Sequence, residues 1–337
     1  ISSNNTYNSS KAMVGDVVTL TIVADEVLNG FGTFNIAGNA INETGSGTDW
    51  SGTYTMQPGD TEGIIAIRLI FVDRANNIGE IVASTTDGSS VTFDRTATNL
   101  STLSVDLNAG SDTGAKNDDN LTNDTTPTFS ITGLTAVGAN GDSLFLVIGT
   151  DTVSRKIVDA NSISFTSTAL ANQVLPYSAT VVSRDPSGNR SDPTTALKFR
   201  IDTQAPNAGN TLNLIAEDDS GFLNTDDITN NTTPRLEISG LAAGKKDSLR
   251  VFYDAQTAGL NDVAIGEYRM SQAVIDTLAI GSVLTDDRYT FTYFVIDSAG
   301  NTSSESASIN VFIDATAPLT PNDPDLGSSW DTGTSNS

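Results

Sequence analysis

Short segments in which apolar residues alternate with polar ones run along the chain and predict β-strands. In residues 18–24 (VTLTIVA), apolar positions alternate with threonines, as in a strand with one buried face. Further segments rich in branched and aromatic residues lie at 64–71, 143–149, 177–182, 248–254 and 289–297. Gly, Asn, Asp and Pro clusters separate these segments, as turns require. The pattern therefore predicts an all-β fold.

One stretch departs from this pattern. Residues 267–281 (EYRMSQAVIDTLAIG) have a helix-like composition, and we expect a short helix or an irregular crossover there. Elsewhere the chain offers many short strands and no helical period, which is typical of Greek-key β-sandwiches of about 100 residues.

Internal repeats divide the chain. Residues 119–134 (DNLTNDTTPTFSITGL) match residues 226–241 (DDITNNTTPRLEISGL), with Pro127 and Pro234 separated by 234 − 127 = 107 positions. Internal similarity at such a period indicates tandem structural units.

Two further markers recur in the same order. An Asp-turn appears as DRANN at 73–77, DPSGN at 185–189 and DSAGN at 297–301. An apolar strand that ends in Asp appears as VTFDRTAT at 91–98, FRIDTQAP at 199–206 and VFIDATAP at 311–318. We therefore predict three β-sandwich domains, at residues 1–97, 98–205 and 206–317.

The last segment resembles the start of another unit. Asp331, Thr332 and Gly333 match Asp112, Thr113 and Gly114. We therefore expect residues 318–337 to be the truncated start of a further repeat, and the array to continue beyond them.

The charge balance limits the partners. The 337 residues include 17 Lys and Arg against 41 Asp and Glu, a formal net charge of −24. Such a surface repels nucleic acid and anionic membranes, and attracts cations. Divalent calcium prefers oxygen ligands such as carboxylates. No apolar run approaches the roughly 20 residues that span a bilayer, so we expect no membrane insertion.

The chain contains no Cys and no His. This absence removes disulfides, thiolate zinc sites, the commonest general base and the commonest transition-metal ligand. We therefore expect no enzyme activity and no catalytic residues.

Together these motifs resemble the bacterial Ig-like repeats of large cell-surface adhesins, including the biofilm-associated type. The most specific part is the segment SDTGAKNDDNLTNDTTP at 111–127, followed by the order D-x-[AS]-G-N, a strand and D-x-x-A-P. Residues 1–97 look like a variant class, with AMVGDVVTLTIVADE at 12–26 and no SDTG segment.

The resemblance implies tandem Ig-like Greek-key sandwiches in an extended array. It implies a secreted, monomeric stalk segment at the bacterial cell surface, in contact with neighbouring repeats of the same chain. A surface or glycan target would then be bound elsewhere in the protein. A carbohydrate- or protein-binding module, with its site around Trp50, and an accessory region of a large secreted enzyme remain as alternatives.

Acidic residues recur where domains are expected to meet, and we expect calcium to bind there. In an Ig-like sandwich, three acidic segments would converge on each junction: the end of one domain, the start of the next, and the Asp-turn of that next domain. The expected ligands are Asp94, Asp112, Asp118, Asp119, Asp185, Asp202, Asp219, Asp226, Asp227, Asp297 and Asp314.

The alternative is that these acids only form turns. Asp and Asn side chains close Asx-turns, and Gly188 and Gly300 would supply a positive φ. For Asn189 and Asn301 we favour the turn interpretation over a ligand role. For the SDTG segment we favour calcium.

Overall fold

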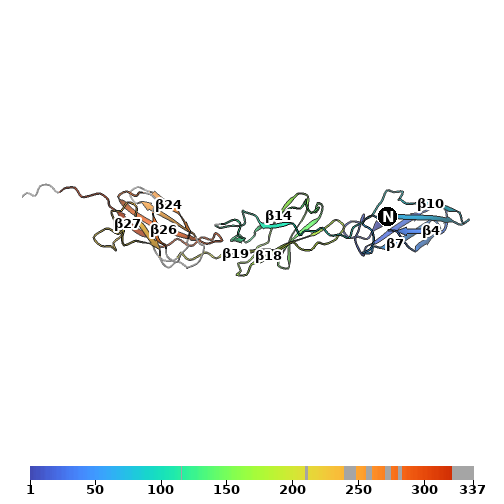
Figure 1. Cartoon of the computed structure of the whole chain (residues 1–337), viewed down its shortest axis with the longest axis horizontal. Helices are drawn as coiled ribbons and strands as arrows, with labels where there is room; N and C mark the ends of the chain where they lie inside the picture. Colours follow the sequence, from blue (N-terminus) through green and yellow to red (C-terminus); the bar gives the residue numbers. More distant parts are fainter. Residues whose placement is uncertain are drawn as a thin grey trace, which may run out of the picture. The chain divides into compact units, whose positions relative to one another are not determined.

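The structure is a computed structural model that describes residues 1–114, 116–208, 212–238, 248–255, 260–269, 275–279 and 283–320. Within this part, every regular element is a β-strand, which confirms the all-β prediction (Figure 1). No described helix is long and apolar enough to cross a membrane. The chain divides into two compact units, residues 1–203 and 204–337. Among the described residues, the first unit contains two separate hydrophobic cores and the second contains one, and we describe the part around each core as a domain. Most of the expected fourth repeat, residues 321–337, lies outside the described residues.

Strands of the first domain form three small sheets around one core. The first sheet has the order β1-β3-β7-β6, the second β10-β9-β4-β5, and the third β2-β11-β8. Their bounds are Ser2–Ser3 (β1), Lys11–Ala12 (β2), Val17–Val23 (β3), Leu28–Ile36 (β4), Asn39–Ala40 (β5), Glu43–Ser46 (β6), Asp49–Thr55 (β7), Gly63–Ile64 (β8), Ile67–Asp73 (β9), Ile78–Val82 (β10) and Thr92–Phe93 (β11). Val18, Phe34, Leu69 and Phe93 are among the buried residues of its core.

The second domain is a two-sheet sandwich. A three-stranded sheet of order β12-β14-β17 faces a five-stranded sheet of order β13-β19-β18-β15-β16. The bounds are Ser104–Leu107 (β12), Leu121–Thr122 (β13), Thr128–Thr132 (β14), Ser143–Ile148 (β15), Asp151–Ile157 (β16), Ser162–Thr166 (β17), Tyr177–Arg184 (β18) and Leu197–Ile201 (β19). Buried residues from both sheets, such as Phe129 and Phe199, share one core.

The third domain repeats this topology. Its sheets have the orders β20-β22-β25 and β21-β27-β26-β23-β24, which match those of the second domain strand for strand. The bounds are Leu212–Leu214 (β20), Ile228–Thr229 (β21), Arg235–Ile238 (β22), Ser248–Ala255 (β23), Leu260–Arg269 (β24), Ile275–Ala279 (β25), Asp287–Ile296 (β26) and Ile309–Ile313 (β27). The two copies of the repeat therefore fold alike.

Alternation along each strand builds these cores. In β15, Leu144, Leu146 and Ile148 are buried, while the residues between them are more exposed. In β26, Tyr289, Phe291, Tyr293 and Val295 are buried at every second position. Because successive side chains of a strand point to opposite faces, this spacing sends one set into the core.

Two predicted elements differ from the structure. Residues 267–281 contain no described helix: β24 and β25 take up the described part, and residues 270–274 and 280–281 lie outside it. Here the strand pairing overrides a helix-like composition. Residues 64–71 do not form one strand, because the chain leaves β8 at Ile64 and enters β9, in another sheet, at Ile67. The other predicted strands are confirmed within one or two residues.

The register defines the two ends of each repeat. In the second domain, the short strand β13 runs parallel to the last strand β19, with Thr122 beside Ile201. We call the end where the last strand finishes the exit end. Strand β18 runs antiparallel to β19, so Arg184 and the turn after it lie at the opposite end, which we call the entry end. The third domain has the same arrangement, with Thr229 beside Ile313.

Candidate metal-binding sites

The three recurrent Asp-turns are closed by their own side chains. Asp185 Oδ1 accepts hydrogen bonds from the main-chain N–H groups of Ser187, Gly188 and Asn189, at 2.8, 2.8 and 3.0 Å. Its Oδ2 accepts one from the side-chain amide of Asn189, at 2.9 Å. Four donors on one carboxylate fix the turn in a single conformation.

The same bonds recur in the other two domains. Asn301 donates to Asp297 Oδ2 at 2.9 Å, and Asn77 donates to Asp73 Oδ2 at 2.7 Å. The turn-stabilising role expected for Asn189 and Asn301 is confirmed. Gly188 and Gly300 adopt φ values of 105° and 90°, which favour glycine.

A different environment surrounds Asp112, in the loop between β12 and β13 at the exit end of the second domain. Asp112 is 3% exposed, and its Oδ2 accepts the main-chain N–H of Asn120 at 3.1 Å. Its Oδ1 is buried without a hydrogen-bond partner among the described residues, and so is the side-chain oxygen of Asn120. Asn120 has a φ of 59°, in the left-handed region. Buried oxygens without donors are costly, and a cation would compensate them.

The third domain contains the same arrangement 219 − 112 = 107 positions later. Asp219 is buried, its Oδ2 accepts the N–H of Asp227 at 3.3 Å, and its Oδ1 has no partner among the described residues. Asp227 has a φ of 58°, matching Asn120. A buried aspartate oxygen without a hydrogen-bond partner therefore recurs at the same position of both repeats.

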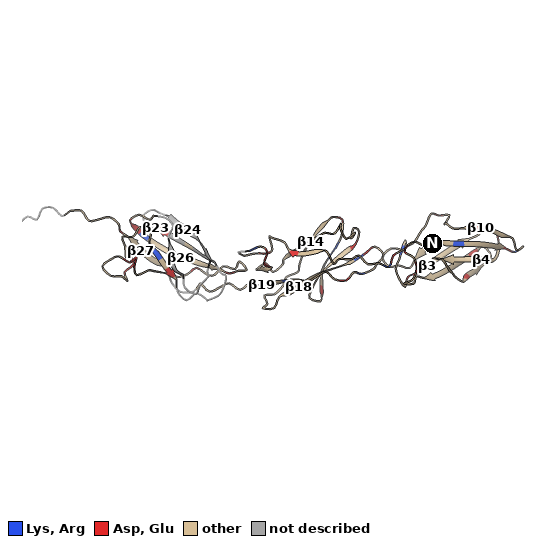
Figure 2. Cartoon of the chain, viewed as in Figure 1, with Lys and Arg blue, Asp and Glu red and all other residues tan. Residues whose placement is uncertain are grey.

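The charge at these loops is unfavourable for ionised carboxylates. Burial raises the pKa of Asp112, and the nearby charges of Asp119, Asp106 and Asp118 raise it further. Burial likewise raises the pKa of Asp227, with added contributions from Asp219 and Asp226. Figure 2 shows acidic positions, in red, in all three domains, and the whole chain has 41 acidic residues against 17 basic ones. A bound cation would relieve this repulsion.

Other expected ligands lie near the loops that contain Asp112 and Asp219. The main-chain N–H of Asp202 donates to Thr122 O at 2.8 Å, and that of Asp314 donates to Thr229 O at 2.9 Å, so both acids stand beside these loops. The carboxylate of Asp119 accepts a hydrogen bond from the main-chain N–H of Leu121 at 3.2 Å, and that of Asp226 accepts one from Ile228 at 3.3 Å. Asp118 is exposed.

Across the described residues, no three acidic side chains lie close enough together to form one metal-binding group.

The boundary between the first two domains holds another set of acids. Asp94, at the exit end of the first domain, accepts a hydrogen bond on Oδ2 from Ser187 Oγ at 3.2 Å. Asp142, between β14 and β15, is buried, and one of its oxygens lacks a partner within the described part of the chain. Burial raises the pKa of Asp142, and the charges of Asp185 and Asp94 add to this effect.

The expected convergence of three acidic segments is wrong in one respect. Asp112 and Asp119 lie at the exit end of their domain, beside Asp202, whereas Asp185 lies at the entry end. In the third domain, Asp219, Asp226 and Asp227 likewise lie beside Asp314 and away from Asp297. The reason is that β13 and β21 pair in parallel with the last strand, which carries the preceding loop to the exit end.

Asp142, Asn5 and Asp16 are further polar residues at these domain ends that were not among the predicted ligands. Asn5 donates its side-chain amide both to Asp16 Oδ2 and to the main-chain oxygen of Ser187, each at 2.7 Å, and so links the first two domains. A signal for Asp142 existed, because the triplet Asp-Ser-Leu occurs at 142–144 and again at 247–249. Asp247 lies outside the described residues.

Trp50 does not form an exposed aromatic platform. Its ring packs edge-on against Phe31, with 5.6 Å between centroids, and its Nε1 donates to Gly47 O at 3.0 Å. Gly52 lies between Trp50 and Tyr54 on the strand and is packed against Phe34, where a Cβ would come within 2.7 Å of the ring. These contacts are those of a strand face packed onto the core.

Comparison with known proteins identifies the family. The family model of the bacterial Ig-like domain matches residues 99–203 and 207–315, more than half of the chain. No curated protein sequence matches significantly. The structure is similar to fibronectin(III)-like modules of Clostridium thermocellum CbhA (12% identity, 65% of this chain, 99% of that one, TM-score 0.38). It is also similar to the FN1–FN3 domains of chicken CNTN1 (11% identity, 89% and 96%, TM-score 0.38).

A third similar structure is a tetra-tandem repeat in the extending region of a large adhesion protein (20% identity, 91% of this chain, 69% of that one, TM-score 0.28). At these TM-scores the similarities carry no functional argument. The family match rests on the repeats themselves, which share motifs, strand order and loop geometry. This chain therefore belongs to the bacterial Ig-like domain family.

Proposed function

We propose that this chain is a non-enzymatic extension segment of a bacterial cell-surface adhesin, stiffened by calcium bound at the ends of its domains. Tandem sandwiches of one family, an acidic surface and the absence of Cys and His support this role. The observation that carries the calcium part is the buried, unpartnered Oδ1 of Asp112, repeated at Asp219.

Calcium binds six to eight oxygen ligands, mostly from carboxylates and carbonyls. In the second domain, Asp112, Asn120 and a neighbouring carboxylate such as Asp119 would hold the ion. In the third domain, Asp219, Asp227 and Asp226 would do so. The ion would supply positive charge to oxygens that have no donor, and would hold the loop in its folded conformation.

The proposal predicts a ligand-dependent gain in stability. A ligand that binds only the folded state adds about 2.7 kcal/mol at a hundredfold excess over its Kd. Extracellular modules bind calcium at about 10⁻⁴ to 10⁻³ M. Millimolar calcium should therefore raise the free energy of unfolding modestly at each site.

Calorimetric titration of the full chain with calcium, after chelator treatment, tests this. We expect saturable binding that is lost in part in Asp112→Asn and in Asp219→Asn, and lost further when both are combined. Asp192→Asn removes the same charge from an exposed position between β18 and β19, and should bind calcium as the parent does. Absence of saturable binding in the parent would remove calcium from the proposal and leave the extension role standing.

A further inference from the structure

A hollow at the boundary between the first two domains, lined by residues of both, has a volume of about 430 Å³. Its lining combines the charged and aromatic groups Arg155, Arg184, Phe145 and Tyr7 with the polar groups of Asn8 and Ser143. Small-molecule sites in proteins commonly occupy 300–1,000 Å³. In size, the hollow fits one or two sugar rings.

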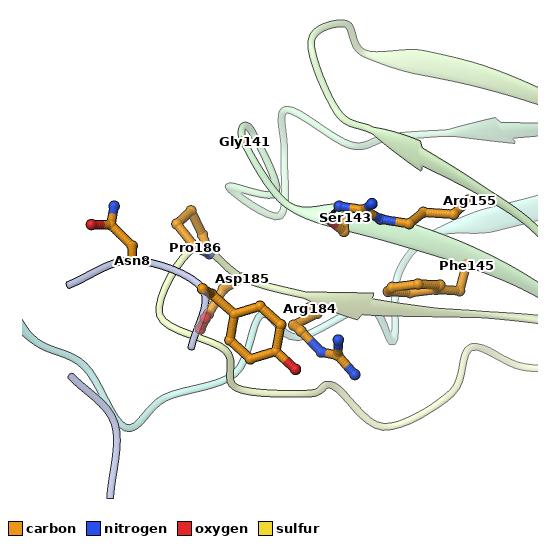
Figure 3. Close-up of a pocket in the computed structure, with 9 residues that line it drawn as sticks. Asn8, Gly141, Ser143, Phe145, Arg155, Arg184, Asp185 and Pro186 are labelled. Carbon is orange, nitrogen blue, oxygen red and sulfur yellow. Dashed lines mark hydrogen bonds between the residues drawn. The ribbon is translucent and has the colours of Figure 1, made fainter. Parts of the chain in front are cut away.

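Two guanidinium groups flank one aromatic ring in this hollow. The Cζ of Arg155 lies 5.9 Å from the centroid of the Phe145 ring, and the Cζ of Arg184 lies 5.5 Å from it. Figure 3 shows Phe145 between the two arginines on the outer face of the sheet. The register explains the placement, because Phe145 stands opposite Arg155 and Ser143 stands opposite Arg184.

Neither arginine pairs with a carboxylate among the described residues; the ion pairs there involve Arg95, Arg200 and Arg235. Arg155 donates to Ser143 Oγ at 2.8 Å, and Arg184 lies 4.8 Å from the centroid of the Tyr7 ring. The carboxylate of Asp185 also borders the hollow, but its oxygens are engaged by the turn. Two uncompensated guanidiniums are unusual in a chain with 41 acidic and 17 basic residues, and they create a local preference for an anion.

The fold does not require this group. The third domain has the same strand order, and its corresponding positions are Arg250, Glu267 and Ile296 in place of Phe145, Arg155 and Arg184. The backbone register is kept, since Arg250 pairs with Glu267 as Phe145 pairs with Arg155. The arginine–phenylalanine–arginine group of the second domain is therefore replaced at the corresponding positions of the third.

We propose that this hollow binds a saccharide that carries a carboxylate, of the uronic acid class. Arginine recognises carboxylates with two parallel hydrogen bonds. Tyr7, which is 52% exposed, offers an aromatic face to the C–H groups of a sugar ring, and Ser143 and Asn8, which line the hollow, offer polar groups to its hydroxyls. An acidic peptide such as polyglutamate would pair its carboxylates with the arginines but carries no sugar ring to stack its C–H groups on Tyr7. The site does not depend on bound calcium.

Titration by NMR of the full chain in chelator tests the assignment. The probe is a tetrasaccharide containing glucuronic acid, compared with the same tetrasaccharide after reduction of its carboxylates to alcohols, and with a tetraglutamate peptide. We expect the acidic saccharide to bind at least tenfold more tightly than either comparison, with shifts at the amides of residues 143–145 and 184–186.

The variant Arg155→Gln/Arg184→Gln should weaken binding of the acidic saccharide at least tenfold while its melting temperature stays near that of the parent. Arg200→Gln, at the exit end of the same domain, is the matched control and should bind like the parent. If the double variant unfolds, Ser143→Ala and Asn8→Ala take its place, and each should weaken binding. Equal binding of the acidic and reduced saccharides, preference for the peptide, or no binding at all would overturn the proposal.

Discussion

The side-chain amide of Asn189 donates a hydrogen bond to the main-chain oxygen of Asp94 at 3.0 Å, across the boundary between the first two domains. The same amide closes its own turn on Asp185 at 2.9 Å. One residue therefore serves both the fold of the second domain and its contact with the first. The motif that recurs three times along the sequence is thus also part of a joint.

Gly188 lies at the centre of this joint. Its φ is 105°, and a Cβ there would come within 2.8 Å of Tyr7 Cδ2 and 3.1 Å of Met13 Sδ. We expect Gly188→Ala to separate Tyr7 from the turn and to loosen the first domain against the second, without unfolding either. Because the chain contains no Cys, spin labels can be placed on Thr53→Cys and Thr150→Cys, and the distance distribution between them should broaden.

Gly300→Ala is the matched control for this change. Gly300 has a similar φ of 90° in the corresponding turn of the third domain, so the alanine adds comparable local strain of about 1 kcal/mol. The label distance in the first two domains should stay as in the parent. A distribution in Gly188→Ala that equals that of the control would show that Tyr7 does not hold the joint.

The buried acid Asp112 should make stability in chelator fall as pH rises. Its folded-state pKa is raised, chiefly by burial, so the folded protein binds this proton more tightly than the unfolded chain does. The protonated Asp112 contributes to the free energy of unfolding below the ordinary Asp pKa of about 3.9. This contribution is lost as pH rises through the raised folded-state pKa. Asp112→Asn cannot ionise, so its unfolding free energy should decline less steeply above about pH 4 than that of the parent.

Urea unfolding of the second domain between about pH 4 and pH 7 measures this slope. Asp192→Asn, which removes an exposed charge, should keep the slope of the parent. A variant Asp112→Asn with the parental slope would mean that the carboxylate is solvated in the folded state.

The third domain should show the opposite pH dependence at Asp218. Arg235 donates to both carboxylate oxygens, at 2.8 and 2.9 Å, and these hydrogen bonds lower the pKa of Asp218 despite its burial. The ionised Asp218 stabilises the folded third domain above the ordinary Asp pKa. This stabilisation is lost as pH falls through the lowered folded-state pKa of Asp218.

Asp218→Asn should therefore lower the unfolding free energy of the third domain at pH 7 by about 1–2 kcal/mol, and by much less near pH 2. The figure is below that of a fully buried pair because the Arg235 side chain is 40% exposed. Glu62→Gln breaks the exposed pair with Arg95 in the first domain and should cost less than Asp218→Asn does, because solvent screens that pair. Equal losses from Asp218→Asn at both pH values would contradict the assigned pair.

The strands and repeats were predictable because they follow from local patterns. The alternation in 143–149 and 289–297 places β15 and β26, and the Asp-turns follow from residues within five positions of one another. The prediction of a helix at 267–281 was wrong because β24 and β25 form by pairing with β23 and β22. The composition of the stretch does not encode these partners.

The candidate sites were predictable only in part. The acids were found by their recurrence, but the end of the domain at which Asp112 lies depends on the parallel pairing of β13 with β19, a contact between residues about 80 positions apart. Asp142 and Asn5 escaped because their role comes from burial and from contacts across a domain boundary. The arginine group at Phe145 likewise depends on the register of three strands.

The most direct test of the central claim is small-angle X-ray scattering of the full chain, in millimolar calcium and in chelator. If calcium stiffens the segment at its domain ends, the maximum dimension should be longer in calcium, and the combined Asp112→Asn/Asp219→Asn variant in calcium should scatter like the chelated parent. Superimposable curves of the parent in calcium and in chelator would contradict the account, and the acidic loops would then be formers of turns alone.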